Sequence, residues 1–304
     1  IYPPHSHTTH THNTRHTTTG SRETSTRTTK REEEKVGVTV TTQQALKMGH
    51  GGRNEALDEE MTIGVMALQG SYQCHAKVLI GLDNKILTRE IREIAELDGI
   101  DGLILPGGES SAMGVLESEL DTPSAGIFTH VKRLIEQGLP VYGTCAGLIL
   151  LCNQALGQKS GGQPLIGGLD ATVCRNFFGS QVQSFELPLK AVGFDTDFPA
   201  VFIRAPAILR LGKEATSLAS VSAKPCKQAH RLVHEYIAEA QQPPSKKQKN
   251  STEKKEQNDS VDVIVAAKQN NILVTSFHPE LTNDTRWHQL FISMCKEHKT
   301  CRDI

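Results

Sequence analysis

From residue 61 onward, short apolar runs alternate with stretches of helical spacing, and this alternation is the strongest constraint on the fold. Four early runs predict buried strands at residues 62–70, 85–91, 101–108 and 139–144. Three later runs predict strands at 201–205, 261–268 and 272–278, and the short "QNN" segment between the last two suggests a hairpin. Helical spacing predicts helices at 124–138, 146–156 and 284–298. Strands that alternate with helices are typical of an α/β domain.

Two polar regions lie outside this pattern. Residues 1–31 hold eleven threonines and five histidines, residues 32–60 are little more apolar, and residues 241–260 contain no apolar residue. Such segments bury too little surface to offset the entropy cost of ordering. We therefore expect 1–60 to be a disordered leader or a gene-model extension, with the natural protein beginning at Met61. Residues 61–304 would form one domain with a disordered insertion at 241–260, whose "KKQK" is either a charged loop or a patch for an anionic partner.

Charge and cysteine content narrow the class of protein. A formal net charge of −1 gives no reason to expect a nucleic-acid partner, and no window approaches the roughly 18 apolar residues of a membrane span. Seven cysteines without a C-x-x-C pair fit neither a disulfide framework nor a zinc module, so we expect a reducing, cytoplasmic location and no metal. Six of them are expected to be ordinary core or exposed thiols: Cys74, Cys152, Cys174, Cys226, Cys295 and Cys301.

The seventh cysteine lies in the segment "VYGTCAGLILL", between a predicted strand and a predicted helix. A sharp strand-to-helix turn exposes the side chain at its apex and requires small neighbours, which Gly143 and Gly147 provide. A helix that begins near Ala146 directs its free N–H groups and dipole at the sulfur, which favours the thiolate. The alternative is a buried structural cysteine with glycines beside it by chance, but the pattern favours Cys145 as a nucleophile.

Two further motifs supply groups that a thiol nucleophile needs. In "SFHPEL", His278 follows a predicted strand and Glu280 stands two residues later, so the carboxylate can orient the imidazole as the third member of a triad does. In "LPGGESSAM", Gly107 and Gly108 end a strand before a helix that we expect to be capped by serine. Backbone N–H groups in such a turn can stabilise an oxyanion. Each motif alone is weak, but together they predict a Cys–His–Glu catalytic site.

These motifs, with "GVMALQG", "RNFFGSQ", "FIRAP" and "FHPELT", resemble class I glutamine amidotransferases, and among them the glutaminase subunits of pyridoxal 5′-phosphate synthase. The resemblance runs from about Met61 to the last helix and is loose around 207–240. It implies an open, mixed and mostly parallel sheet flanked by helices, a flavodoxin-like three-layer arrangement. It also implies hydrolysis of glutamine to glutamate and ammonia, without a cofactor, and passage of the ammonia to a separate synthase subunit in a hetero-oligomer.

The resemblance also assigns roles to individual residues. It implies that Cys145 attacks the glutamine amide, that His278 moves the proton and that Glu280 orients His278. The residues at positions that bind glutamine in the family are Gly108, Glu109, Ser110, Arg175, Ile203 and Arg204. Residues matching the oxyanion site or its activation by the synthase are Gly107, Gly108, Ala146 and Gln69.

One position departs from the family pattern, and two other functions stay open. Where the family has arginine in "RN-x-FGRQ", this sequence has Ser180, which puts a detail of partner contact or site support in doubt. One alternative is a glutaminase of another pathway, such as imidazole glycerol phosphate synthesis, or a γ-glutamyl hydrolase. The other is a non-catalytic regulatory subunit, against which the three intact residues argue.

Overall fold

The computed structural model describes residues 60–119, 122–158, 161–179, 184–241 and 259–302. The expected leader, apart from Glu60, lies outside these ranges, as do Ser180 and residues 242–258 of the expected insertion. The chain divides into two units, Ile1–Lys35 and Val36–Ile304, and every described residue belongs to the second.

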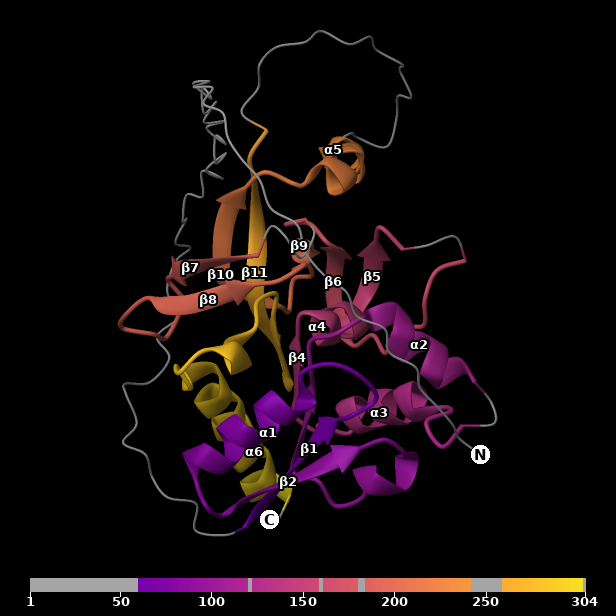
Figure 1. The fold of residues 1–304 in the computed structure, drawn as a ribbon, viewed down its shortest axis with the longest axis vertical. Coiled ribbons are helices and arrows are strands. Elements are labelled where there is room, and N and C mark those ends of the chain that lie inside the picture. The colour runs from indigo at the N-terminus through magenta and orange to yellow at the C-terminus, as the bar shows by residue number, and fades with distance from the viewer. Residues whose placement is uncertain (1–59, 120–121, 159–160, 180–183, 242–258, 303–304) are drawn as a thin grey trace, which may run out of the picture. The chain divides into compact units, whose positions relative to one another are not determined.

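The described part of the chain is built on a ten-stranded mixed sheet, with strand order β2-β1-β3-β4-β12-β11-β9-β6-β5 and β10 paired to β11 (Figure 1). Pairing is parallel from β2 to β12 and between β5 and β6, and antiparallel around β9, β10 and β11. A separate antiparallel pair is formed by β7 and β8. The strands are β1 Met61–Met66, β2 Ile86–Ile91, β3 Gly102–Leu105, β4 Val141–Thr144, β5 Cys152–Leu156, β6 Leu169–Cys174, β7 Phe185–Leu189, β8 Phe198–Phe202, β9 Ala207–Leu211, β10 Thr216–Ala223, β11 Val261–Gln269 and β12 Ile272–Thr275.

Helices cover both faces of the parallel half of the sheet, which gives the three layers that the resemblance implies. On one face, Leu79 of α1 and Phe291 of α6 pack on the strands, and on the other Val131 of α3 and Met113 of α2 do so. The helices are α1 Tyr72–Leu82, α2 Ser110–Ser118, α3 Ile127–Glu136, α4 Ala146–Leu151, α5 Lys227–Gln241 and α6 Arg286–Arg302, with short 3₁₀ helices η1 Ile94–Leu97 and η3 Pro279–Leu281.

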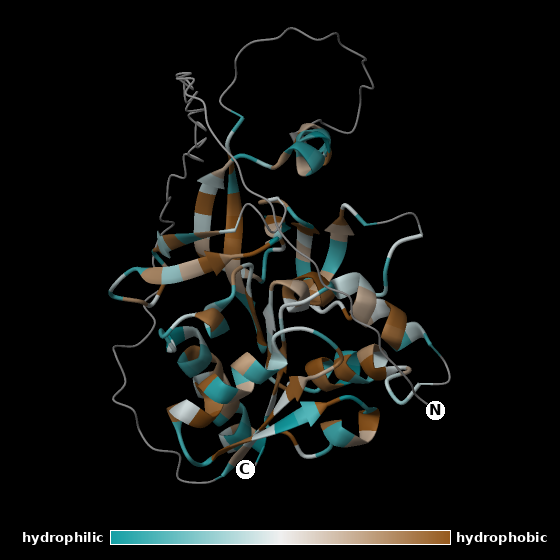
Figure 2. Ribbon diagram, viewed as in Figure 1, coloured by the Kyte–Doolittle hydropathy of each residue, from teal (hydrophilic) through white to brown (hydrophobic). Residues whose placement is uncertain are grey.

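The central strands are apolar on both faces because both faces are covered. In β3, Ile104 belongs to the core beneath α1 and α6, whereas Leu103 and Leu105 belong to the core beneath α2 and α3. Tyr142 and Val141 of β4 divide in the same way. Successive side chains of a strand point to opposite faces, so a strand buried on both sides reads as a continuous apolar run. Figure 2 shows this apolar character along the strands at the centre of the fold.

The strand order explains how distant sequence motifs meet. Strands β3, β4 and β12 are parallel neighbours, with Leu105 paired to Gly143 and Thr144 paired to Thr275. Their carboxyl ends therefore lie at one edge of the sheet. The Pro-Gly-Gly-Glu turn follows β3, Cys145 follows β4 and His278 comes three residues after β12, which places all three motifs at the edge where open α/β sheets carry their sites.

Several predicted elements are wrong in extent. The strands predicted at 62–70, 101–108 and 272–278 end earlier, at Met66, Leu105 and Thr275. Two further differences have a local cause. The predicted helix at 146–156 is the one-and-a-half-turn α4 followed by β5, which begins at Cys152 and pairs with β6. Every residue of α4 is buried, so its apolar run has no helical periodicity to mark where the helix ends. The strand predicted at 201–205 is β8, which already ends at Phe202, because Arg204 turns the chain with a φ of 48°.

No helix in the described ranges combines the length and the apolar character that crossing a bilayer requires. All seven cysteines are free. Burial raises the pKa of the Cys152 thiol, and burial followed by the neighbouring Cys226 raises that of Cys174 to about 12, so both remain protonated core groups at neutral pH, as expected.

Candidate active site

Cys145 stands at a strained turn between β4 and α4. Its backbone has φ 47° and ψ −96°, outside the regions that residues with a side chain favour, which costs about 1–3 kcal/mol. The Cys145 N–H donates to the Thr275 carbonyl oxygen at 2.8 Å, which ties the turn to the end of β12. The side chain is 5% exposed, and its Sγ lies 3.8 Å from the Ile203 carbonyl oxygen. The geometry is that of the predicted nucleophile elbow.

The glycines beside Cys145 are needed for close packing rather than for an unusual backbone conformation. Only Cys145 itself has a positive φ in this turn. A Cβ on Gly147 would lie 2.8 Å from the Leu105 Cβ and overlap the Leu105 carbonyl, because α4 rests against the end of β3. A Cβ on Gly143 would lie 2.7 Å from the Gly147 carbonyl carbon. The predicted requirement for small neighbours holds, and its cause is the contact between helix and strands.

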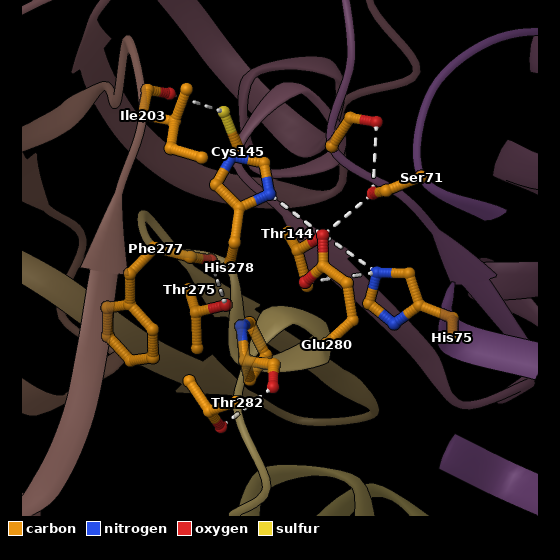
Figure 3. Close-up of polar contacts among 12 residues, drawn as sticks. Ser71, His75, Thr144, Cys145, Ile203, Thr275, Phe277, His278, Glu280 and Thr282 are labelled. Atoms are coloured by element: carbon orange, nitrogen blue, oxygen red, sulfur yellow. Dashed lines mark hydrogen bonds and ion pairs between the residues drawn. The ribbon is translucent and has the colours of Figure 1, made fainter. Parts of the chain in front are cut away.

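His278 and Glu280 lie beside Cys145 and are 7% and 6% exposed (Figure 3). The His278 Nδ1–H donates to Glu280 Oε1 at 2.8 Å, which leaves the other ring nitrogen for the thiol. The imidazole ring lies over the turn after β3, since a Cβ on Gly107 would lie 2.8 Å from His278 Nδ1. The structure thus brings together the three residues that the sequence predicts, in the order thiol, imidazole, carboxylate.

The electrostatics of the site favour the charged forms of His278 and Glu280. Burial alone lowers the pKa of His278, but hydrogen bonds and charge interactions with Cys145 and Glu280 raise it well above its usual range. Burial alone raises the pKa of Glu280, but His75, His278 and Ser71 together lower it to about 2. An ionised carboxylate beside a proton-holding imidazole is the arrangement that supports a thiolate nucleophile.

A second charged cluster borders the site and contains three of the predicted glutamine-binding residues. Glu109 accepts from Arg175 through Oε1 and from Arg204 through Oε2, both at 3.0 Å. Burial raises the pKa of Glu109, but its hydrogen bond from Ser111 and the two arginines outweigh this and lower it. Arg204 has a positive φ of 48° and Asn176, next to Arg175, one of 51°. Such backbone strain is common at functional sites.

The remaining predicted residues also border Cys145 or the turn after β3, with one correction. Gln69 Oε1 accepts from the Glu109 N–H at 2.6 Å. The buried Ser110 hydroxyl lies 3.4 Å from Gln163 Oε1, a residue that sequence reasoning missed. Ala146 begins α4. The cap of α2 is not serine, as predicted, but Glu109, whose carboxylate accepts from the Ser111 N–H at 3.4 Å because the first serine already lies inside the helix.

Comparison with known proteins decides the family. The model of the SNO glutamine amidotransferase family matches residues 65–233 and 242–297. The chain belongs to this family. Its glutamine amidotransferase fold also matches a solved structure described as a glutamine amidotransferase, with a TM-score of 0.57 and 35% identity over 77% of this chain and 98% of the other.

Two similar proteins are named as subunits of pyridoxal 5′-phosphate synthase. A probable pyridoxal 5′-phosphate synthase subunit of Arabidopsis thaliana is 43% identical over 243 residues, which cover 78% of this chain and 87% of the relative. A pyridoxal 5′-phosphate synthase subunit of Dehalococcoides mccartyi is 39% identical over 240 residues, which cover 79% of this chain and all of the relative.

This amidotransferase has a second layer of residues behind Cys145, His278 and Glu280 that sequence reasoning missed. The Ser71 hydroxyl donates to Glu280 Oε1 at 2.7 Å, and His75 Nε2 lies 3.5 Å from Glu280 Oε2 (Figure 3). On its other side, His75 Nδ1 lies 2.9 Å from His288 Nε2. Burial lowers the pKa of both histidines, that of His288 to about 3, so both are neutral at pH 7.

The contacts settle the tautomers of this histidine pair. His75 Nε2 lies 3.2 Å from Thr144 Oγ1 and 3.5 Å from Glu280 Oε2, which has no hydrogen bond within the described part of the chain. A hydrogen on Nε2 can be donated to Thr144 Oγ1 while it faces the carboxylate, whereas a lone pair there would face the carboxylate oxygen, so His75 carries its hydrogen on Nε2. His75 Nδ1 then accepts from the His288 Nε2–H. The His288 Nδ1, which has no partner among the described residues, is left as an acceptor. The only sequence signal was the i, i+4 spacing of Ser71 and His75 at the start of α1.

Proposed function

We propose that the protein is the glutaminase component of a pyridoxal 5′-phosphate synthase. It hydrolyses L-glutamine to L-glutamate and ammonia and supplies the ammonia to a separate synthase subunit. The observation that carries the proposal is the Cys145–His278–Glu280 arrangement in a chain of the glutamine amidotransferase family. The names of the two relatives support the assignment to vitamin B6 synthesis.

The first half of the reaction forms a thioester. The Cys145 sulfur attacks the side-chain amide carbon of glutamine, and the amide oxygen becomes an oxyanion. As the tetrahedral intermediate collapses, protonated His278 gives its proton to the departing nitrogen and ammonia leaves. Backbone N–H groups of Gly107, Gly108 and Ala146 are the candidates for stabilising the oxyanion.

The second half restores the enzyme. Neutral His278 removes a proton from water, the hydroxide attacks the thioester carbon, and the carbon–sulfur bond breaks to release glutamate and the Cys145 thiolate. His278 keeps the proton for the next cycle. Glu280 holds the imidazole in one orientation and one tautomer through both halves, since its bond to Nδ1 fixes which nitrogen faces the sulfur.

Glutamine binding is assigned to the second charged cluster and its neighbours. A free amino acid presents a carboxylate, which suits the guanidinium groups of Arg175 and Arg204, and an ammonium group, which suits Glu109. Gly108, Ser110 and the Ile203 backbone complete the proposed site. Without substrate, Glu109 is paired with both arginines, so glutamine would replace part of an existing ion-pair network.

The synthase subunit is proposed as a partner in a hetero-oligomer that also controls activity. Cys145 is nearly enclosed, and the Gln69 side chain holds the peptide N–H of Glu109 beside the proposed oxyanion turn. We expect a partner that displaces this contact to raise the rate. Neither a membrane nor a nucleic acid is proposed as a partner, and the free thiols support a reducing, cytoplasmic location.

The test is ammonia release from glutamine by the full chain, with and without the synthase subunit. Activity that rises with the synthase and disappears in Cys145→Ala is the expected result. A glutamine-like electrophile should modify Cys145 selectively, and the other six cysteines serve as internal controls. Folded protein without activity in any combination, and without selective labelling, would make the chain a non-catalytic regulatory subunit.

A further inference from the structure

Outside the triad, one group of side chains has the composition and placement of a metal site. His230 and His234 of α5 and Asp259, which precedes β11, each offer a ligand atom, and these atoms lie within 4.8 Å of one another. We propose that these three residues bind a divalent transition-metal cation of the Zn²⁺ type and join α5 to β11.

The two histidines are placed by helix geometry. Residues four apart lie one above the other on the same helix face, and the two imidazole rings have a centroid separation of 4.2 Å. The Nε2 atom of His234 is buried and has no hydrogen-bond partner among the described residues. Leaving a buried polar atom unpaired is unfavourable, because the atom has lost its hydrogen bonds to water. A metal ion would give this nitrogen a partner.

The carboxylate is placed by the register of the antiparallel pair β10 and β11. Ala223 at the end of β10 pairs with Val261 at the start of β11, so Asp259 lies just beyond this end of the pair, where the chain enters α5 four residues after Ala223. Figure 1 shows α5 beyond these strand ends. The other acidic residue beside the histidines, Glu235, is already paired with Arg231 at 2.7 Å, which leaves Asp259 as the carboxylate ligand.

The ligand set indicates the class of metal. Two imidazoles and one carboxylate suit zinc, cobalt, nickel or copper and not the all-oxygen sites of magnesium or calcium. Bonds of about 2.0–2.2 Å place neighbouring ligand atoms of a tetrahedron about 3.3 Å apart, so small side-chain rotations are sufficient to close the site. His230 and Asp259 are exposed, and water can take the fourth position. The ligands come from either side of residues 242–258, so the cation would crosslink α5 and β11.

The test is titration of the metal-free full chain with Zn²⁺ against a chromophoric chelator, and with Co²⁺ by absorption. His230→Ala, His234→Ala and Asp259→Asn are compared with His130→Ala, which removes a partly exposed histidine of α3. Since every variant keeps the histidines of residues 1–60 and all cysteines, those groups contribute equally to each titration. We expect one tight site in the wild type, weakened on the order of 10–100-fold in each ligand variant and unchanged in His130→Ala.

The cobalt complex should show ligand-field bands of a low-coordinate site without a thiolate-to-cobalt charge-transfer band. Affinity should fall below pH of about 6.5, where imidazoles gain protons. Wild-type protein with no stoichiometric site would overturn the proposal. So would a site that survives in the His230→Ala/His234→Ala double variant, or one that is lost equally in His130→Ala. The result does not depend on glutaminase activity, so it is independent of the proposed function.

Discussion

Replacing His75 tests whether the second layer behind the proposed catalytic residues contributes to catalysis. His75→Leu removes the N–H that faces Glu280 Oε2 at 3.5 Å and that also lies 3.2 Å from Thr144 Oγ1. A full hydrogen bond to a charged group contributes about 1.5–3 kcal/mol, and the contact at 3.5 Å is weaker than that, so the lower end is its upper limit. About 1.4 kcal/mol corresponds to a tenfold change in rate. We therefore expect kcat to fall about three- to tenfold.

The assay is glutamine hydrolysis by the full chain with its synthase partner, with kcat and KM measured separately. Neither ring nitrogen of His75 bonds to a proposed glutamine-binding residue, so KM should not change. His75→Gln, whose amide can donate to Glu280, should recover part of the rate. Tyr142→Phe is the matched control, because it removes a buried hydroxyl in contact with Thr275 from the same cluster without altering Glu280.

The unfolding free energy of each variant distinguishes a loss of Glu280 positioning from general damage to the core. His75→Leu also removes the acceptor for His288, and we expect it to lose about 1–3 kcal/mol of unfolding free energy. Tyr142→Phe should lose about 1 kcal/mol and keep its kcat. An unchanged kcat in folded His75→Leu would refute the reasoning, and so would an equal loss of kcat in Tyr142→Phe.

Three further changes test other parts of the site. Gly107→Ala pushes the His278 ring aside and should reduce kcat about 100-fold with little change in melting temperature; normal kinetics would contradict the packing described here. His75 and His288 have pKa values below 6.5 in the folded state. Below pH 6.5 the folded state therefore binds fewer protons than the unfolded state. The unfolding free energy should fall by up to about 1.4 kcal/mol per pH unit per histidine as the pH drops from 6.5 towards the folded-state pKa values. The unfolding free energy of His288→Phe, measured by urea titration at several pH values, should depend less steeply on pH than that of the wild type. An unchanged pH dependence would exclude His288 as one of its causes. Arg175→Lys should raise KM for glutamine about tenfold, from the loss of a charged hydrogen bond; an unchanged KM would remove Arg175 from the binding site.

The parts of the fold that are predicted best from the sequence are short buried strands that end at a recognisable turn motif. Strands β3, β4 and β12 each have an apolar run that stops at Pro-Gly-Gly, at Cys145 or before His-Pro, and all three were predicted. The failure at 146–156 has the opposite cause. There every residue of helix α4 is buried and the apolar run continues into Cys152, the first residue of β5, so the run does not show where the helix ends and only the pairing of Cys152 with Leu169 marks the change. That pairing is a tertiary contact, which local sequence does not specify.

The candidate site divides in a similar way. Cys145, His278 and Glu280 were predicted because their motifs combine reactive groups with glycine or proline at turns. Ser71 and His75 were missed because they contact a carboxylate about 200 residues later, and a serine and a histidine near a helix start are common without any such role. Gly143 and Gly147 were correctly predicted as small neighbours of the turn, but only the contacts of α4 with β3 and β4 show that close packing, rather than backbone freedom, requires them.

The charged groups of the site form two networks of ion pairs and hydrogen bonds, one around Glu280 and one around Glu109. The two networks differ in how deeply they are buried. Glu280 is bonded to His278 and Ser71, with His75 behind it, and all but Ser71 are buried, so removing its charge would leave uncompensated groups in a low-dielectric interior. In the Glu109 cluster the Glu109 and Arg204 side chains are partly exposed whereas Arg175 is nearly buried, so the ion pair of Arg204 is the one that can be exchanged at small cost. One charge network is therefore fixed and holds the imidazole, while the other has an exchangeable pair, as the proposed binding of an amino acid requires. The difference in burial thus explains why the Glu280 network is rigid and why the Arg204–Glu109 ion pair can exchange.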